Sequence, residues 1–147
     1  MCILETKEDV LDGLAALDAY AQQFATGLAL GDVVALRGPL GSGKTTFVRA
    51  LVRALHGSDA AVSSPTFIFR QRYDGTPPIE HVDLYRIEDP AHELPDLALD
   101  EAFAPDRIAI VEWPDHAPGW LPRRRIEVSI DGVGDGPRTI RVQRREG

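Results

Sequence analysis

The first part of the chain carries apolar residues at helical spacing. They recur at every third or fourth position from Val10 to Leu28, which is the pattern of a helix with one buried face. Residues 6–9 resemble a helix-capping start, with Asp9 in place of the usual glutamate. We therefore expect an amphipathic helix over residues 7–27.

A strand, a glycine-rich loop and a second helix follow in close succession. Residues 33–36 form a short, wholly apolar run, which is typical of a strand that is buried on both faces. Residues 38–43 contain three glycines, and residues 47–55 again place apolar side chains on one helix face. Gly57 is suited to end that helix.

The middle of the chain predicts more strands and short helices. Residues 66–73 and 79–84 indicate two strands joined by a proline- and glycine-containing turn. The acidic residues 88–104 include two prolines and favour short helices. Residues 108–111 are a second apolar run, so we expect another buried strand there.

The last third of the chain predicts a loop and then a hairpin. Residues 113–122 hold three prolines and must be mostly loop. Apolar residues then alternate over 126–130 and again over 140–142, with glycines at 132–136 between them. The whole pattern predicts an α/β fold of three layers, with a mixed sheet, an internal strand at 33–36 and a C-terminal antiparallel hairpin.

Length and composition support a single domain over residues 1–147. The chain has a mass of 16.1 kDa and 44% hydrophobic residues, which is enough for a hydrophobic core that needs no disulfide or metal ion to stabilise it. One cysteine, Cys2, excludes an internal disulfide framework and a multi-cysteine zinc site. We expect a cytoplasmic protein, because no apolar run approaches the roughly 18 residues of a membrane span and the N-terminus does not resemble a signal peptide.

Charge is distributed unevenly along the chain. The net charge is −7, which argues against a protein whose main task is to grip a nucleic-acid backbone. Residues 76–122 hold 11 acidic and 2 basic side chains, whereas residues 123–147 hold 4 and 7. Arginine accounts for 14 of the 16 basic residues, so Lys7 and Lys44 are the only lysines.

The glycine-rich loop carries the clearest chemical signal. Residues 38–45 match G-x-x-x-x-G-K-[ST], the P-loop signature, directly after a predicted buried strand and before a predicted helix. Glycines let backbone N–H groups point at phosphate oxygens, and the start of the helix adds a partial positive charge. Lys44 would neutralise the β- and γ-phosphates and Thr45 would bind Mg²⁺. The expected nucleotide-binding residues of this motif are Pro39, Leu40, Gly41, Ser42, Gly43, Lys44, Thr45 and Thr46.

A P-loop NTPase also needs an acid at the end of a buried strand to hold magnesium. Glu112 follows the apolar run 108–111, and Asp83 follows a less apolar strand. A solvated strand end would also explain Glu112, and a helix cap or an ion pair with Arg86 would equally explain Asp83. Lys44, Glu112 and Asp83 are therefore the candidate catalytic residues, and Thr45, Asp83 and Glu112 are the candidate metal ligands.

The base of the nucleotide can be argued in part. Many GTPases read guanine with an [NT]-K-x-D motif placed after the P-loop. The chain contains no asparagine, and its only looser match, residues 6–9, precedes the loop. We therefore expect ATP.

Several ordered blocks together resemble the TsaE (YjeE) family of bacterial P-loop ATPases. They are GPLGSGKTTFVRAL at 38–51, SSPTF at 63–67, HVDLYRI at 81–87, ELPDLALDEAF at 93–103 and VEWP at 111–114. The P-loop alone would be unspecific, but this order of blocks is highly specific. The resemblance covers roughly residues 28–130.

The resemblance implies a function and a set of roles. It implies Mg²⁺-dependent ATP hydrolysis in support of threonylcarbamoylation of tRNA adenosine beside the anticodon, with TsaB and TsaD as partners and tRNA contacted only through them. Thr66 resembles a contact near the γ-phosphate, and Asp83 resembles the family's acid near magnesium. Glu112 resembles its Walker B acid, and Trp113 resembles the aromatic residue beside that acid.

Two other functions remain open from the residues alone. One is a small-molecule kinase of shikimate or adenylate type, in which residues 123–125, three arginines, would close over phosphates. The other is a nucleotide-switched binding module without significant catalysis. Arg86 is a candidate for an arginine that acts in cis on the nucleotide. The four histidines show no metal-ligand spacing, so surface or capping roles are expected for them.

Overall fold

A seven-stranded mixed sheet organises the chain in the computed structural model, which describes residues 2–62 and 69–146. The strand order is β1-β7-β6-β2-β5-β4-β3. The strands are β1 (Cys2–Leu11), β2 (Val33–Arg37), β3 (Arg70–Tyr73), β4 (Ile79–Asp83), β5 (Ile108–Glu112), β6 (Arg125–Asp131) and β7 (Arg138–Glu146).

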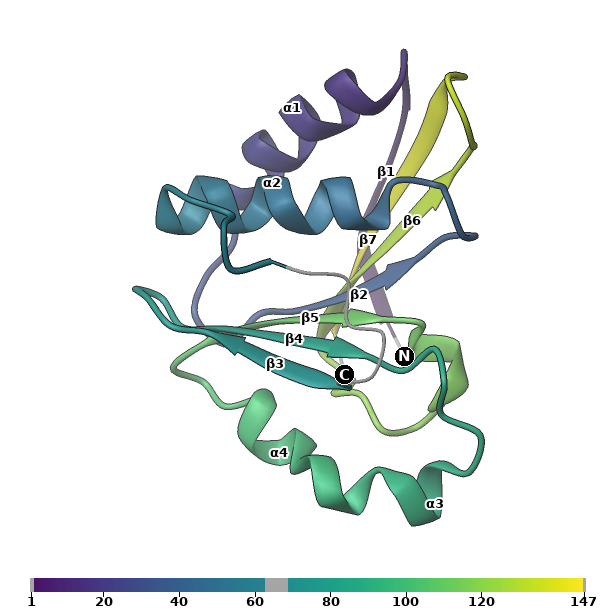
Figure 1. Cartoon of the computed structure of the whole chain (residues 1–147). Helices are drawn as coiled ribbons and strands as arrows, with labels where there is room; N and C mark the ends of the chain where they lie inside the picture. Colours follow the sequence, from purple (N-terminus) through teal and green to yellow (C-terminus); the bar gives the residue numbers. More distant parts are fainter. Residues whose placement is uncertain (1, 63–68, 147) are drawn as a thin grey trace.

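Helices cover both faces of this sheet, as Figure 1 shows. The two longer helices, α1 (Leu14–Ala25) and α2 (Lys44–His56), lie on one face. The short helices α3 (Pro90–Glu93) and α4 (Leu99–Ala102) lie on the other, with the turn η1 (Pro95–Leu97) between them. The expected three-layer α/β fold is therefore confirmed.

Each face of the sheet has its own hydrophobic core. Leu17 of α1 and Phe47 and Leu51 of α2 pack against residues of β2, β6 and β7 in the larger core. Leu94 and Leu99 cover the opposite face, against residues of β4 and β5. The sheet is buried on both sides near its centre, which explains why residues 33–36 and 108–111 are wholly apolar.

The strand that precedes the P-loop is internal, as expected. β2 runs parallel to β5 on one side, with Leu36 opposite Glu112, and parallel to β6 on the other. β4 extends the parallel part beyond β5, and Asp83 lies opposite Glu112. The carboxyl ends of β2, β5 and β4 therefore meet at one edge of the sheet, which is where α/β proteins place their ligands.

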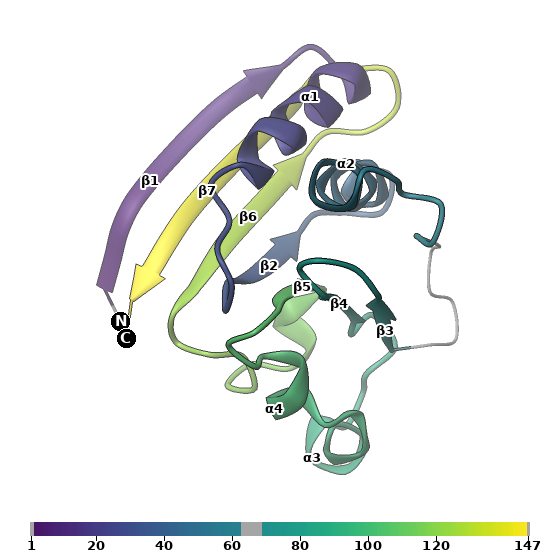
Figure 2. The same ribbon diagram turned by 90° about the vertical axis from the view of Figure 1, so that its left-hand side faces the viewer.

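The expected C-terminal hairpin is also confirmed. β6 and β7 pair antiparallel, with Ile130 opposite Ile140. Figure 2 shows that β7 in turn lies beside the long strand β1, at the outer end of the sheet. Residues 113–122 are mostly loop, as expected, apart from the short turn η2 (Pro114–His116).

The expectation of a helix starting at residue 7 is wrong. Residues 2–11 form β1, which pairs antiparallel with the whole of β7, and α1 begins only at Leu14. Val10 is 72% exposed, so it does not belong to a buried helix face. Pairing with an otherwise open edge of the sheet satisfies the backbone of both strands and outweighs a weak local helix preference. Gly13, with φ +146°, separates the strand from the helix.

The expected pair of strands in the middle of the chain is confirmed over the part that the structure describes. β3 begins at Arg70 and pairs antiparallel with β4. Residues 66–68 of the expected first strand lie outside the described residues. Within the described ranges, no helix is long and apolar enough to cross a membrane.

Candidate functional site

A cavity of about 420 Å³ opens at the carboxyl ends of β2, β4 and β5. It lies at the first turn of α2, directly beyond the glycine-rich loop. Its lining includes nearly all of the predicted site residues: Pro39, Leu40, Gly41, Gly43, Lys44, Thr45, Thr46, Asp83, Glu112 and Trp113. Among the described residues, Leu14, Phe69, Tyr85 and Arg86 also line it.

Of the predicted site residues that the structure describes, only Ser42 does not line this cavity. Ser42 is fully buried, and its Oγ has no hydrogen-bond partner among the described residues. Thr66 lies outside the described residues. Both remain predictions as nucleotide contacts.

The glycines of the loop are required by its conformation. Gly41 and Gly43 have φ values of +82° and +110°, which residues with a side chain rarely adopt. A Cβ on Gly43 would also stand 2.6 Å from Leu17 Cδ2. A Cβ on Gly38 would stand 2.5 Å from Ser42 Oγ and 2.7 Å from the carbonyl oxygen of Ile130. The loop is therefore packed closely against α1 and the end of β6.

Lys44 points across the mouth of the loop and is 7% exposed. Its Nζ donates a hydrogen bond to the carbonyl oxygen of Gly38 and lies 3.9 Å from the centre of the Trp113 ring. Burial lowers the pKa of Lys44, and the negative charges of Glu112 and Asp83 partly oppose that shift. The ammonium thus lies against an indole face and in the electrostatic field of two nearby acids.

Trp113 reaches this position through an unusual backbone conformation. It follows β5 with φ +58°, in the left-handed region. That conformation costs about 1–2 kcal/mol for a residue with a side chain. Its ring packs against Tyr85, with centroids 4.9 Å apart, and against His116, at 5.4 Å. Trp113 and Tyr85 of this aromatic cluster line the cavity, and the Trp113 ring faces Lys44.

The two predicted acids are brought together on neighbouring strands. Asp83 and Glu112 end β4 and β5 at the same register position. Burial raises the pKa of Asp83, the hydrogen bond from the Tyr85 N–H to Oδ1 opposes this, and the charge of Glu112 adds to it. Two adjacent carboxylates at a half-buried edge are a suitable place for a cation.

Glu112 is held from behind by a buried hydrogen-bonded chain. His81 Nε2 lies 2.5 Å from Glu112 Oε2, and His81 Nδ1 lies 2.8 Å from the hydroxyl of Tyr73. That hydroxyl also lies 3.1 Å from Oε1 of Gln71. Burial raises the pKa of Tyr73 to about 12, and the charge of Glu112 adds to the shift. These side-chain contacts fix the orientation of the Glu112 carboxylate at the edge of the cavity.

The oxygen donors at this site fit a magnesium ion that is coordinated partly by the protein and partly by the phosphates of a nucleotide. The Thr45 hydroxyl and the Asp83 and Glu112 carboxylates border one cavity, and Mg²⁺ prefers such hard oxygen ligands. No group of three or more His, Cys, Asp or Glu side chains within the described ranges forms a metal cage. An ion with one or two protein carboxylates and several phosphate or water ligands matches that arrangement.

The expectation of a surface or capping role is wrong for His81, which is buried. Its spacing from Asp83, two residues along one strand, places both side chains on the same face of β4. That alternation could have identified His81 as part of the site. Nothing in the local sequence marks Tyr85, Phe69 or Leu14 as lining residues, because they come from three separate segments.

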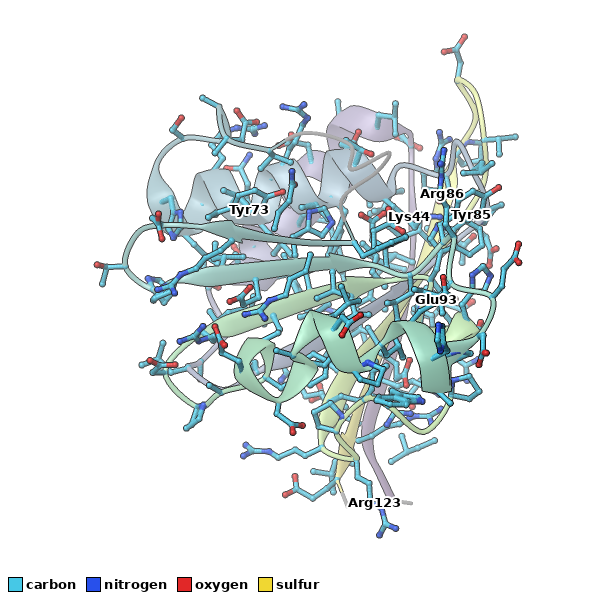
Figure 3. All side chains as sticks on the ribbon, turned by 60° about the horizontal axis from the view of Figure 1, so that its bottom comes forward. Lys44, Tyr73, Tyr85, Arg86, Glu93 and Arg123 are labelled. Atoms are coloured by element: carbon cyan, nitrogen blue, oxygen red, sulfur yellow. The ribbon has the colours of Figure 1, made fainter. Side chains whose placement is uncertain are left out.

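The basic segment at residues 123–125 lies away from the cavity. Arg125 begins β6 at the end that pairs with the start of β2, whereas the loop follows the opposite end of β2. Figure 3 shows Lys44, Tyr85 and Arg86 close together and Arg123 well apart from them. The three arginines therefore do not form a lid over the cavity in this structure.

The fold and the site together define the class of protein. A buried parallel strand, a glycine loop, a lysine at the start of a helix, and acids at the ends of neighbouring strands constitute the P-loop NTPase fold. Residues 11–140 match the family model described as threonylcarbamoyl adenosine biosynthesis protein TsaE. The chain therefore belongs to the TsaE family.

Individual relatives agree with this assignment. The chain is 42% identical over 111 residues to the tRNA threonylcarbamoyladenosine biosynthesis protein TsaE of Bacillus subtilis, covering 75% of this chain and 68% of the relative. It is 40% identical over 119 residues to the protein of the same name from Streptomyces coelicolor, covering 78% of each. The crystal structure of YdiB from Bacillus subtilis superposes with a TM-score of 0.78 at 28% identity, covering 99% of this chain and 89% of that one.

Proposed function

We propose that this chain binds ATP together with Mg²⁺, hydrolyses it to ADP and phosphate, and in this way supports the threonylcarbamoylation of tRNA adenosine beside the anticodon. TsaB and TsaD are its proposed protein partners, and tRNA is reached through them. One observation carries the proposal: Lys44, Asp83 and Glu112, which are far apart in sequence, border one cavity at the glycine-rich loop.

The loop would bind the phosphates through its backbone. Gly43 is the N-cap of α2 and Lys44 is its first residue, so their N–H groups belong to the free positive end of that helix. The Lys44 ammonium would exchange the Gly38 carbonyl oxygen for an oxygen of the β- or γ-phosphate. That exchange keeps its hydrogen bond and gains an opposite charge.

The two acids would divide their tasks. Asp83 and Thr45 would hold Mg²⁺, because burial disfavours the ionised form of Asp83 and a cation restores it. When bound, Mg²⁺ neutralises charge on the β- and γ-phosphates. Glu112 would orient the attacking water, since His81 already occupies one of its oxygens and fixes its direction.

The isolated chain is expected to turn over slowly. Arg86 borders the cavity and is the described arginine placed to act in cis. A partner that turns Arg86 towards the phosphates or supplies its own cation would stabilise charge in the transition state. We therefore propose faster hydrolysis in the complex with TsaB and TsaD.

A kinase for small molecules is less well supported. The three arginines at 123–125, proposed as its lid, lie at the opposite end of β6 from the loop. The other alternative is a nucleotide switch without significant catalysis. It would use the same nucleotide site, so measurement of phosphate release distinguishes it from an ATPase.

Complementation in cells that lack their own TsaE protein tests the proposed role. The wild-type chain should restore threonylcarbamoyladenosine in tRNA, and Lys44→Ala should not, although it should accumulate to the same level. Lys7→Ala is the matched control, because Lys7 lies on the exposed edge strand β1. Full restoration by Lys44→Ala would contradict a role that depends on nucleotide binding.

A further inference from the structure

Arg138 is a buried cation directly behind the phosphate loop. It begins β7 and is 1% exposed. Its Nε donates to the carbonyl oxygen of Ser42 at 2.7 Å, and its Nη2 lies 3.4 Å from the carbonyl oxygen of Gly41. The same guanidinium donates to the carbonyl oxygens of Gly136 at 2.7 Å and Gly134 at 2.9 Å. One side chain therefore joins the loop to the turn between β6 and β7.

These bonds determine which way a peptide group of the loop faces. In a planar trans peptide the carbonyl and the next N–H point in opposite directions. Because the Ser42 carbonyl points at Arg138, the N–H of Gly43 points away from Arg138. Gly43 lines the cavity and precedes the first residue of α2. Arg138 thus holds this peptide with its N–H directed to where phosphate would bind.

The charge of Arg138 is left without a counter-charge. Its partners are backbone carbonyls, and no carboxylate among residues 2–62 and 69–146 forms an ion pair with it. The carbonyl oxygens accept hydrogen bonds from its N–H groups, but the desolvation free energy of a buried positive charge remains unfavourable unless a negative charge lies nearby. An anion bound in front of the loop would supply that charge.

We propose that Arg138 is a positioning residue for the nucleotide: it holds the phosphate loop in its binding conformation from behind and adds positive potential to the phosphate site. This inference rests on the proposed binding of ATP. It assigns Arg138 no contact with the nucleotide, so its effect falls on affinity and not on the chemical step.

The test compares three variants by ATP and ADP binding, and by phosphate release with the partners present. Arg138→Met should weaken ATP and ADP binding roughly tenfold, because it removes both the charge-assisted bonds and the charge. The apparent KM should rise by a similar factor, while kcat at saturating ATP stays within about twofold. Arg138→Lys keeps the charge and should recover part of the affinity. Arg141→Met, an exposed arginine of the same strand, is the matched control.

Binding is measured well below the unfolding midpoint of each variant, so that a loss of stability alone does not change it. A folded Arg138→Met protein with wild-type affinity would overturn the inference. If Arg138→Met does not fold, the ATP affinity of Arg138→Lys tests the inference. A single ammonium cannot contact both the phosphate loop and the turn between β6 and β7, so this variant should still bind ATP about threefold more weakly than the wild type. Wild-type affinity in Arg138→Lys would then overturn it. Failure of the wild-type chain to bind ATP would instead refute the proposed function.

Discussion

The Nε2 atom of His81 lies 2.5 Å from Oε2 of Glu112, in a place where the two side chains are only 3% and 7% exposed. The acid at the end of β5 is therefore anchored by a residue of the neighbouring strand. Tyr73 supports His81 in turn, through a contact of 2.8 Å to Nδ1. A carboxylate fixed in this way has one oxygen left to face the cavity, and His81 holds its direction in the protein without ligand.

Replacement of Glu112 separates catalysis from binding. Glu112→Gln keeps the shape and the contact to His81 but removes the charge that would orient a water molecule. Phosphate release should fall by about 100-fold or more, as for the loss of other groups that act on the transition state. ATP binding should stay within about threefold of wild type by calorimetry. Unchanged phosphate release would exclude Glu112 from the chemical step and favour a nucleotide switch.

Replacement of His81 tests the anchoring of Glu112. His81→Phe fills a similar volume but leaves the Glu112 carboxylate without its buried partner. We expect kcat to fall roughly tenfold with little change in ATP affinity, because a misdirected group loses most of its catalytic effect. His92→Phe, on the exposed helix α3, is the control. A variant with wild-type kcat would show that Glu112 needs no such support.

Lys44 should not tolerate arginine. Its ammonium fits between the Gly38 carbonyl oxygen and the face of Trp113, a space suited to a compact point charge and not to a planar guanidinium. Lys44→Arg should weaken ATP binding at least tenfold. The loss of one charge-assisted hydrogen bond costs about 1.5–3 kcal/mol of binding free energy, which corresponds to such a factor. Lys7→Arg should bind as the wild type does. Retained affinity in Lys44→Arg would contradict a specific role for the ammonium.

Asp83 should reduce the stability of the ligand-free protein at neutral pH. Burial raises its pKa above that of the unfolded chain, so the folded state binds this proton more tightly. Its contribution to stability is therefore greatest in acid and is lost as the pH rises through that pKa. Asp83→Asn, which keeps the oxygen that accepts the Tyr85 N–H, should have a higher unfolding midpoint than the wild type at about pH 7.

The difference between Asp83→Asn and the wild type should shrink towards about pH 3, where both side chains are neutral. Thermal unfolding followed by circular dichroism, without nucleotide or magnesium, measures it at both pH values. Asp74→Asn, in a side chain that is 91% exposed, is the control and should change little. A lower midpoint for Asp83→Asn at neutral pH would show that the ionised carboxylate stabilises the site.

Much of the fold and site could be predicted because the signals are local. The apolar runs at 33–36 and 108–111 are continuous, and the loop motif fixes the position of Lys44 at the start of α2. The convergence of Asp83 and Glu112 follows from the parallel pairing of two buried strands. The apolar runs and the loop motif needed no knowledge of distant contacts, whereas the convergence of the two acids depends on the pairing of β4 with β5.

The parts that failed depend on partners distant in sequence. β1 exists because the edge of β7 is available to it, and residues 2–11 do not carry that information. His81 became significant only when β5 placed Glu112 beside it. Arg138 looks like any arginine of a solvated hairpin until its contacts to the carbonyls of Gly41 and Ser42 are known.

Phosphate release from ATP, measured for the wild-type chain and for Glu112→Gln, alone and with TsaB and TsaD, tests the central claim most directly. The proposal predicts slow release by the wild-type chain alone, a clear increase when the partners are added, and no increase for Glu112→Gln. Equal rates with and without partners would contradict the coupling. Transfer of the γ-phosphate to a small acceptor in place of water would contradict the assignment as an ATPase.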